Sequence, residues 1–275
     1  MLTTSSPRRR RALRLGLAAA ATVLLTSGCT AREAYENAFG FGYPKPKSEE
    51  AETLYEVWLG TGAAGMAVGV VMWLLIGYTV VRFRKRDEEM PPQIRYNLPI
   101  EVLYTVVPFV IIAVLFFYTA VAENKVNELK AKPDVTVGVV GFQWNWQFVY
   151  ADEKVQTTGI PSKQAELVLP VNKRVRFVET SPDVIHSFWV PHFLFKRDVI
   201  PGRYNAFEIT PNREGTYVGR CAEFCGEKHA RMNFTVKVVS QAEYDAYIAT
   251  LKADPNAVLD DLSRTLDGAI PTARN

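Results

Sequence analysis

The chain has 275 residues, a small positive net charge of +3 and three cysteines. That length is enough for a membrane portion and one small folded domain. The arginines at positions 8–11 directly precede an apolar stretch, which excludes a nucleic-acid-binding patch as their role. We therefore expect no nucleic-acid partner. The mean hydropathy is near zero because two very apolar segments are averaged with a polar remainder.

Residues 1–28 are predicted to be a lipoprotein-type signal peptide. A basic region precedes an apolar stretch, Leu15 to Leu25, which is too short to span a membrane. The following run, Leu25-Thr26-Ser27-Gly28-Cys29, resembles a bacterial lipoprotein box, although Thr26 stands where an aliphatic residue is preferred. This reading predicts cleavage before Cys29 and a lipid on its thiol. A plain signal peptide or an uncleaved anchor remains the alternative.

Residues 29–52 are predicted to be an extracytoplasmic linker, and 53–125 a transmembrane helix hairpin. The segments Val57 to Val81 and Val102 to Ala122 carry no charge, and each exceeds the roughly 20 residues that a helix needs to cross hydrocarbon. The loop between them is rich in arginine and lysine. The positive-inside rule therefore predicts a cytoplasmic loop. Both ends of the mature chain then lie outside the plasma membrane, and the protein is multi-pass.

Residues 126–240 are predicted to form one folded domain, in which the pattern changes to a period of two from about Lys132. Val135, Val137 and Val139 alternate with smaller or polar residues, as do Phe234, Val236 and Val238. Short alternating segments broken by proline and glycine predict a β-sandwich or barrel. Residues 241–275 are predicted to form a short helix, Gln241 to Leu251, and a loosely ordered tail.

Metal-ligand residue types gather near the end of this domain. Cys221, Cys225, His229 and Met232 fall within twelve residues, and His186 lies upstream. Soft sulfur donors with imidazole select copper or zinc, and a thioether is typical of copper electron-transfer sites. A mononuclear site of that type needs one cysteine, so the second thiolate predicts two copper ions bridged by both sulfurs. Each copper ion then takes one histidine, and Met232 and a backbone carbonyl fill the remaining positions.

Three ordinary explanations compete with the copper site. Two cysteines outside the cytoplasm usually form a disulfide. A Cys-x3-Cys pair is also compatible with zinc, although Cys-x2-Cys is the more typical spacing. A methionine three residues after a histidine is often part of a hydrophobic core. To replace the copper site, these three explanations would together have to account for the whole ligand set.

The run Cys221-Ala-Glu-Phe-Cys225-Gly-Glu-Lys-His229-Ala-Arg-Met232 resembles the binuclear copper-A motif of cytochrome c oxidase subunit II, Cys-x-Glu-x-Cys-Gly-x-x-His-x-x-Met. The segments Asp183 to Pro191 and Ile200 to Arg203 also resemble that family, and the likeness covers roughly Glu56 to Val239. It implies the fold class: membrane α + β, a two-helix hairpin followed by an extracytoplasmic cupredoxin-like Greek-key β-sandwich or barrel.

The resemblance also implies roles for single residues. Trp144 becomes the electron entry point, although core packing is the ordinary role of such a residue. The carbonyl of Glu223 ligates copper, while its carboxylate reaches a magnesium or manganese ion shared with subunit I. Glu101 lies at the mouth of a proton pathway, where an ordinary interfacial acid is the alternative. Asp183 and Asp198 either steer a basic cytochrome toward the site or are solvated loop acids.

The predicted function is that of subunit II of a proton-pumping cytochrome c oxidase. Cytochrome c, soluble or part of a reductase assembly, would deliver electrons to the copper centre, which passes them to haem in subunit I for reduction of oxygen to water. Subunit I and further oxidase subunits are the implied partners. A quinol oxidase subunit would lack the copper ligands, and nitrous oxide reductase would lack the hairpin. A copper chaperone or membrane-tethered electron carrier needs no subunit I and is the remaining alternative.

Overall fold

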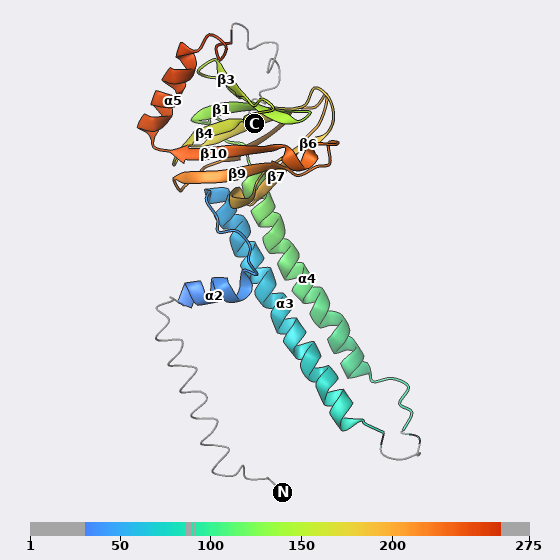
Figure 1. Ribbon diagram of the computed structural model, residues 1–275. Coiled ribbons are helices and arrows are strands. Elements are labelled where there is room, and N and C mark those ends of the chain that lie inside the picture. The colour runs from blue at the N-terminus through green and yellow to red at the C-terminus, as the bar shows by residue number, and fades with distance from the viewer. Residues whose placement is uncertain (1–30, 86–89, 91, 260–275) are drawn as a thin grey trace, which may run out of the picture. The chain divides into compact units, whose positions relative to one another are not determined.

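The computed structural model describes residues 31–85, 90 and 92–259 of the chain. They divide into two compact units (Figure 1). The smaller unit contains residues up to 43 together with 59–82, and the larger contains 44–58 together with everything from 83 onward. The larger unit holds all the strands of the described chain and the predicted metal ligands.

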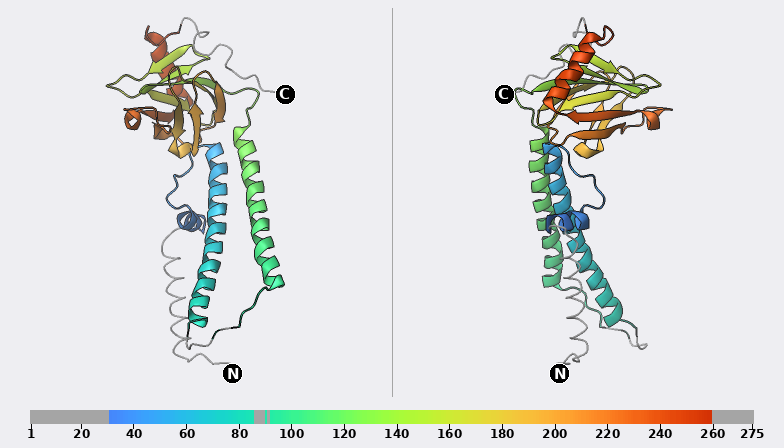
Figure 2. Two further views of the ribbon diagram at one scale, coloured as in Figure 1. Left: turned by 90° about the vertical axis from the view of Figure 1, so that its right-hand side faces the viewer. Right: turned by 60° about the vertical axis from the view of Figure 1, so that its left-hand side comes forward.

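Ten strands of the described chain form two five-stranded sheets in the larger unit (Figure 2). The first sheet has the order β3-β2-β1-β5-β8. Its strands are β1 Val135–Phe142, β2 Asn145–Tyr150, β3 Val155–Thr158, β5 Val175–Thr180 and β8 Asn205–Ile209. The second sheet has the order β4-β10-β9-β6-β7. Its strands are β4 Glu166–Pro170, β6 His186–Val190, β7 Phe195–Val199, β9 Gly215–Cys221 and β10 Asn233–Val239. Only the pairs β1–β5 and β10–β4 are parallel.

The core lies between the two sheets and follows the alternation read from the sequence. The alternating valines of β1 and the alternating Phe234, Val236 and Val238 of β10 are at most 5% exposed. Phe188 of β6 packs on five aromatic rings, and the nearest three, those of Phe177, Phe207 and Phe234, have centroids 5.0–5.9 Å from its own. Fully burying one such side chain stabilises the fold by about 1.5–3 kcal/mol. The predicted fold class, two apolar helices followed by a β-sandwich, is confirmed.

Two long helices precede the sandwich in the chain. They are α3, Glu49–Arg82, and α4, Leu98–Asn127, and each is long and apolar enough to cross a membrane. Both extend beyond the spans predicted from apolar residues alone, because their polar ends are capped. The Ser48 hydroxyl accepts the Ala51 N–H at 3.1 Å, and Asn97 caps the start of α4.

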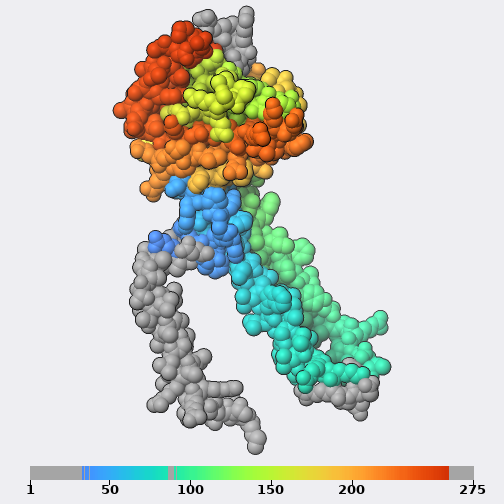
Figure 3. All heavy atoms as spheres, viewed as in Figure 1, coloured from blue at the N-terminus to red at the C-terminus, as the bar shows by residue number. Residues whose placement is uncertain are grey.

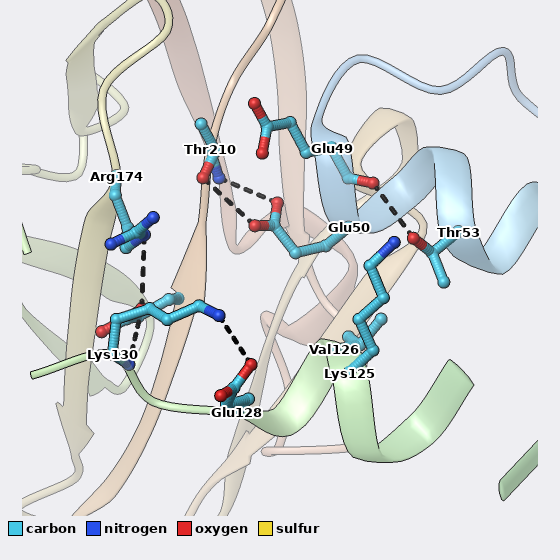
Figure 4. A pocket seen from close by; sticks show the side chains of 10 residues that line it. Glu49, Glu50, Thr53, Lys125, Val126, Glu128, Lys130, Arg174 and Thr210 are labelled. Carbon is cyan, nitrogen blue, oxygen red and sulfur yellow. Dashed lines mark hydrogen bonds and ion pairs between the residues drawn. The ribbon is translucent and has the colours of Figure 1, made fainter. Parts of the chain in front are cut away.

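The first turn of α3 is bound to the sandwich after β8. The carboxylate of Glu50 accepts the N–H of Thr210 at 2.8 Å and its hydroxyl at 3.2 Å (Figure 4). Asn212 donates to Glu52 at 2.7 Å, and the N–H of Glu49 donates to the carbonyl of Thr210. Residues 160 positions apart in the chain are thereby held together, which fastens the first turn of α3 to the sandwich.

The segment after α4 is held by a buried ion pair. Arg176 of β5 and Glu208 of β8 lie 2.7 Å apart, and their side chains are 3% and 4% exposed. Glu208 also accepts the N–H of Lys130, and Arg176 donates to the Lys130 carbonyl. The segment around Lys130 therefore covers this ion pair. A cavity of about 220 Å³ lies beside these groups, and it is lined also by the start of α3 and the end of α4 (Figure 4).

The smaller unit contains a helix in the segment that was predicted to be a linker. This helix, α2, runs over Ala31–Phe39. The hydroxyl of Tyr35 donates to the carbonyl of Leu59, 24 residues later, at 3.2 Å. A side chain at Gly62 would come within 3.2 Å of the Phe39 carbonyl and of the Phe41 ring, so this glycine permits a close approach. The linker prediction missed this local structure because its residues are polar.

The chain after β10 forms the predicted helix and then continues along the sandwich. Helix α5, Gln241–Ala253, begins with a capping box between Ser240 and Glu243 and covers the edge near β3 and β4 (Figures 1 and 3). The tail was predicted to be loosely ordered. Up to residue 259 it instead bonds to the β3 region, where the N–H of Gln156 donates to the carbonyl of Ala257 and the N–H of Leu259 donates to that of Lys154.

Candidate metal centre

His186 is the first residue of β6 and is fully buried. Its Nε2 lies 2.9 Å from the carboxylate of Asp183. A proton on Nε2 leaves Nδ1 unprotonated and free to bind a metal. That Nδ1 lies 3.9 Å from the sulfur of Cys221. The position of the strand and the contact with Asp183 together aim the imidazole at the thiol.

The other predicted ligands lie on the loop between β9 and β10. Cys221 ends β9, and its N–H donates to the carbonyl of Met232 at 3.0 Å, which closes the loop at its base. The N–H of Ala222 donates to the carbonyl of Ser187, next to His186 on β6. A 3-10 turn, η2, over His229–Arg231 carries the second histidine. The loop is thus fastened to the strand that supplies the first histidine.

Six donor atoms from the predicted ligand set converge at this loop. The sulfurs of Cys221 and Cys225 are 3.9 Å apart. Cys225 lies 3.6 Å from Nδ1 of His229 and 3.6 Å from the sulfur of Met232. The carbonyl oxygen of Glu223 lies 3.2 Å from the sulfur of Cys221. Every residue that the sequence predicted as a copper ligand is therefore within contact distance of another.

The donor set fits copper. Cys221 and Cys225 are free thiols, and their 3.9 Å separation far exceeds the ~2.05 Å of a disulfide, so the disulfide alternative does not hold. The thioether of Met232 is fully buried and faces the cluster, and soft sulfur with imidazole is a donor set suited to copper. His186, Cys221 and Cys225 alone place three ligand atoms within 4.8 Å of one another.

The two thiols differ in acidity. Burial opposes ionisation of Cys221, but hydrogen bonds with His186 and with the backbone of Glu223 and Ser187 lower its pKa to about 7. Burial and the neighbouring charge of Cys221 raise the pKa of Cys225 to about 12. The Cys221 thiolate therefore forms readily, and its negative charge opposes ionisation of Cys225. A cation between them removes that repulsion, so metal binding and loss of the second proton are coupled.

Two tryptophans near the cluster, Trp144 and Trp146, occupy different places. Trp146 is fully buried, and its indole N–H donates to the carbonyl of Met232 at 3.3 Å. Trp144 is half-buried, and its indole N–H donates to the carbonyl of Cys225 at 3.2 Å. Trp146 is thus a core residue behind the cluster. Trp144 combines access to solvent with a direct bond to a ligand residue.

Asp183 has a role that sequence reasoning missed. Its carboxylate accepts the N–H of Gln143 at 2.7 Å and that of Val184 at 2.6 Å, besides its contact with His186. Burial opposes its ionisation, yet these hydrogen bonds lower the pKa of the carboxyl below its ordinary value. Asp183 therefore joins the first histidine to the strand end that carries Trp144. Only its position three residues before His186 could have signalled this.

A glycine allows the loop to pass under Trp144. Gly226 has φ +120°, which side chains rarely adopt, and an added Cβ would lie 3.2 Å from the Trp144 indole nitrogen and 3.3 Å from Gln143. The amide of Gln143 also donates to the carbonyl of Cys225, at 2.9 Å. The glycine of the Cys-Gly pair thus lets the ring reach the ligand loop.

The remaining predicted residues lie apart from the cluster or outside the described chain. The Glu223 side chain is exposed, while its carbonyl faces Cys221. Glu101 is far along the chain, in the first turn of α4, where its carboxylate accepts the N–H of Asn97 at 2.8 Å. Cys29 lies outside the residues that the structure describes.

Comparison with known proteins identifies the family. Residues 135–239 match the family described as "Cytochrome C oxidase subunit II, periplasmic domain". A probable cytochrome c oxidase subunit 2 of Streptomyces avermitilis is 44% identical in an alignment that covers 90% of this chain and 89% of that protein. The chain belongs to the cytochrome c oxidase subunit II family. The family predicted from the sequence is thus confirmed.

Other proteins of this family are also similar to the chain. Cytochrome c oxidase subunit 2 of Mycobacterium tuberculosis is 36% identical in an alignment that covers 86% of this chain and 81% of that one. Among solved structures, the periplasmic domain of subunit II from Bradyrhizobium japonicum is 35% identical, with a TM-score of 0.42, and covers 44% of this chain and 96% of that chain. The family and the two apolar helices fit a membrane protein with an extracytoplasmic domain.

Proposed function

We propose that this chain accepts electrons from a cytochrome at a copper centre and passes them to haem in subunit I of a cytochrome c oxidase. The observation that carries the proposal is the convergence of six donor atoms from His186 and the 221–232 loop. Family membership supports the same function. Oxygen reduction and proton pumping belong to the complex with subunit I, since the described chain offers no haem ligand set.

The centre is proposed to hold two copper ions. Cys221 and Cys225 would bridge them, and His186 and His229 would each bind one. Met232 and the Glu223 carbonyl would complete the set. Bound copper supplies one-electron redox chemistry there. The protein's part is to keep the donors in place: the closed loop base and the Asp183 contact limit how far they can move, and a fixed set favours fast electron transfer because little needs to rearrange.

Electrons are proposed to enter through Trp144. Its ring is half-buried, and its indole N–H bonds directly to the carbonyl of Cys225. This gives a path from the surface to Cys225, a proposed bridging ligand, through only two groups: the Trp144 indole ring and the Cys225 carbonyl. The fully buried Trp146 offers no comparable access from solvent.

Two carboxylates are proposed to act at the boundary with subunit I. The exposed side chain of Glu223 would bind a magnesium or manganese ion, hard cations that prefer oxygen ligands, with the other ligands supplied by subunit I. Glu101 would lie at the mouth of a proton pathway. Its contact with Asn97 caps α4 and holds the carboxylate at the helix start.

The membrane arrangement is proposed as predicted from the sequence. Helices α3 and α4 would both cross the plasma membrane, with the basic loop in the cytoplasm and the copper domain outside. Cys29 would carry a lipid. Subunit I and further oxidase subunits would surround the helices, and the donor would be a cytochrome c, soluble or part of a reductase assembly.

Purification in mild detergent tests this function. A tagged copy of the full chain should copurify with haem-bearing subunits and consume oxygen when reduced cytochrome is added. Treatment of that complex with a copper chelator should abolish the consumption without releasing haem. Recovery of this chain alone, with copper but without haem subunits, contradicts the oxidase assignment and identifies a membrane-tethered copper protein.

A further inference from the structure

A groove of about 690 Å³ lies beside Trp144. Its walls are the turn between β1 and β2, the segment 159–164 between β3 and β4, and the end of the ligand loop around η2. These segments are far apart in the chain, and sequence reasoning did not bring them together. The groove therefore adjoins the proposed electron entry point on the outer surface of the copper domain.

All the charged residues that line this groove are cations. They are Lys163, Lys228 and Arg231, and no carboxylate lines it. All three are exposed. The ammonium of Lys228 lies over the Trp144 ring, 5.4 Å from its centroid. Within the described part of the chain, none of the three pairs with a carboxylate. Their charge is thus available to a partner.

The nearby acids do not offset this charge within the groove. Asp183 is occupied by His186 and by backbone N–H groups. Asp198 lies on β7 and does not line the groove. Glu227 is exposed next to Lys228 but is not part of the lining either. Neither of the acids expected from the sequence to steer a basic cytochrome lines the groove.

The groove also offers a small apolar contact. Ile160 is 53% exposed, and it lines the groove together with Trp144 and Pro161. An apolar centre within a charged rim is typical of protein–protein contacts, in which the rim sets orientation and association rate. Most of the residues that line the groove are exposed to solvent. Such a site suits contact with a protein surface better than enclosure of a small molecule.

We infer that this groove docks an electron-donor protein domain whose surface around its redox cofactor is acidic. The inference rests on the proposed function, because it takes Trp144 as the entry point. Opposite charges across the contact would steer the donor and hold its cofactor near the ring. A donor with a basic surface around its cofactor would be repelled by the same three cations.

The test uses the intact oxidase complex and two soluble c-type cytochromes of similar potential, one acidic and one lysine-rich around the haem edge. Reduction of the copper centre is followed by stopped flow. At low ionic strength the acidic cytochrome should react on the order of tenfold faster. The variant Lys163→Glu/Lys228→Glu should reverse that order. At roughly 0.5 M salt the rates should converge, because surface charges are then screened.

Two variants separate docking from damage to the entry point. Lys163→Glu alone leaves the residue over Trp144 in place and should still slow the acidic cytochrome several-fold. Lys252→Glu reverses an exposed charge on α5, outside the groove, and should change neither rate. Faster reaction of the lysine-rich cytochrome with the unaltered complex, or equal effects of Lys163→Glu and Lys252→Glu, overturns the inference.

A small donor distinguishes this failure from failure of the proposed function. Reduced tetramethyl-p-phenylenediamine needs no docking surface and should reduce the copper in every charge variant. If this donor reduces the copper but the lysine-rich cytochrome reacts faster than the acidic one, only the inference of an acidic partner fails. The proposed function then stands. A complex in which neither this donor nor any cytochrome reduces copper removes the proposed function and the docking inference together.

Discussion

The two ends of the larger unit treat their polar groups in opposite ways. At the metal end, sulfur and nitrogen atoms of His186 and the 221–232 loop lie 3.6–3.9 Å apart. At the helix end, Glu50, Arg176 and Glu208 each meet a partner at 2.7–3.0 Å. One end therefore presents donors to a ligand, while the other satisfies its charges internally. Changes at the first should alter redox function, and changes at the second should alter stability.

The largest effect is expected from breaking the metal end. Cys221→Ser removes a proposed bridging sulfur and should abolish binding of the copper pair and electron transfer to haem. Metal analysis of the purified complex and stopped-flow reduction measure both. Met232→Leu, a nearly volume-conserving change, is the graded comparison: copper should stay, while the potential shifts and electron transfer slows. Normal electron transfer in Cys221→Ser would contradict the ligand assignment.

Breaking the helix end should cost stability without touching copper. Glu208→Gln leaves Arg176 buried without its anionic partner, and loss of one member of such a pair destabilises a fold by about 3–5 kcal/mol. Denaturant unfolding of the copper-loaded complex measures this, and the copper spectrum should not change. Glu128→Gln breaks an exposed ion pair in the same region and should have little effect. Equal losses in the two variants would contradict the importance of burial.

A smaller effect at the metal end is expected from Asp183. Asp183→Ala frees the imidazole of His186 and should weaken copper binding by about 10–100-fold, as loss of a hydrogen-bonded partner of a metal ligand usually does. Competition with a copper chelator measures the affinity. Asp198→Ala, an exposed acid on β7, is the matched control. An unchanged affinity in Asp183→Ala would show that the strand alone orients His186.

The smallest effect concerns a buried acid that belongs to neither end. Glu179 of β5 is fully buried, and neither carboxylate oxygen has a hydrogen-bond partner. Burial raises its pKa well above the ordinary 4.5. As the pH rises above 4.5 the unfolded chain ionises this group before the folded one does, so the native protein loses stability.

Glu179→Gln should remove that loss. Its melting temperature should exceed that of the unaltered protein by a margin that grows with pH above 4.5 and vanishes below it. Glu214→Gln, an exposed acid, should show no such trend. Parallel pH profiles for Glu179→Gln and the unaltered protein would mean that the carboxyl is ionised in the folded state.

The metal end was more readable from the sequence than the helix end. Its sulfur ligands and second histidine lie on one short loop, so spacing alone brought them together, and the need for one histidine per copper ion pointed to His186 upstream. The Asp183–Gln143 contact spans 40 residues, and no local pattern reports such a distance. For the same reason the cationic groove, whose walls come from three separate segments, could not be predicted.

The fold followed from periodicity wherever each face of a strand met a single environment. Alternation predicted the inward residues of β1 and β10, and long uncharged runs predicted α3 and α4. Alternation alone does not account for the burial of Arg176, because a segment following α4 covers that face of β5. Helix α2 and the bonded part of the tail were missed because polar composition does not reveal hydrogen bonds to distant parts of the chain.

Electron paramagnetic resonance of the partly oxidised complex tests the central claim most directly. The account predicts two copper ions per chain and a hyperfine pattern from one unpaired electron shared equally by two copper nuclei, lost in Cys221→Ser. The splitting of a single copper nucleus, or a Cys221–Cys225 disulfide in a metal-free native complex, would contradict it.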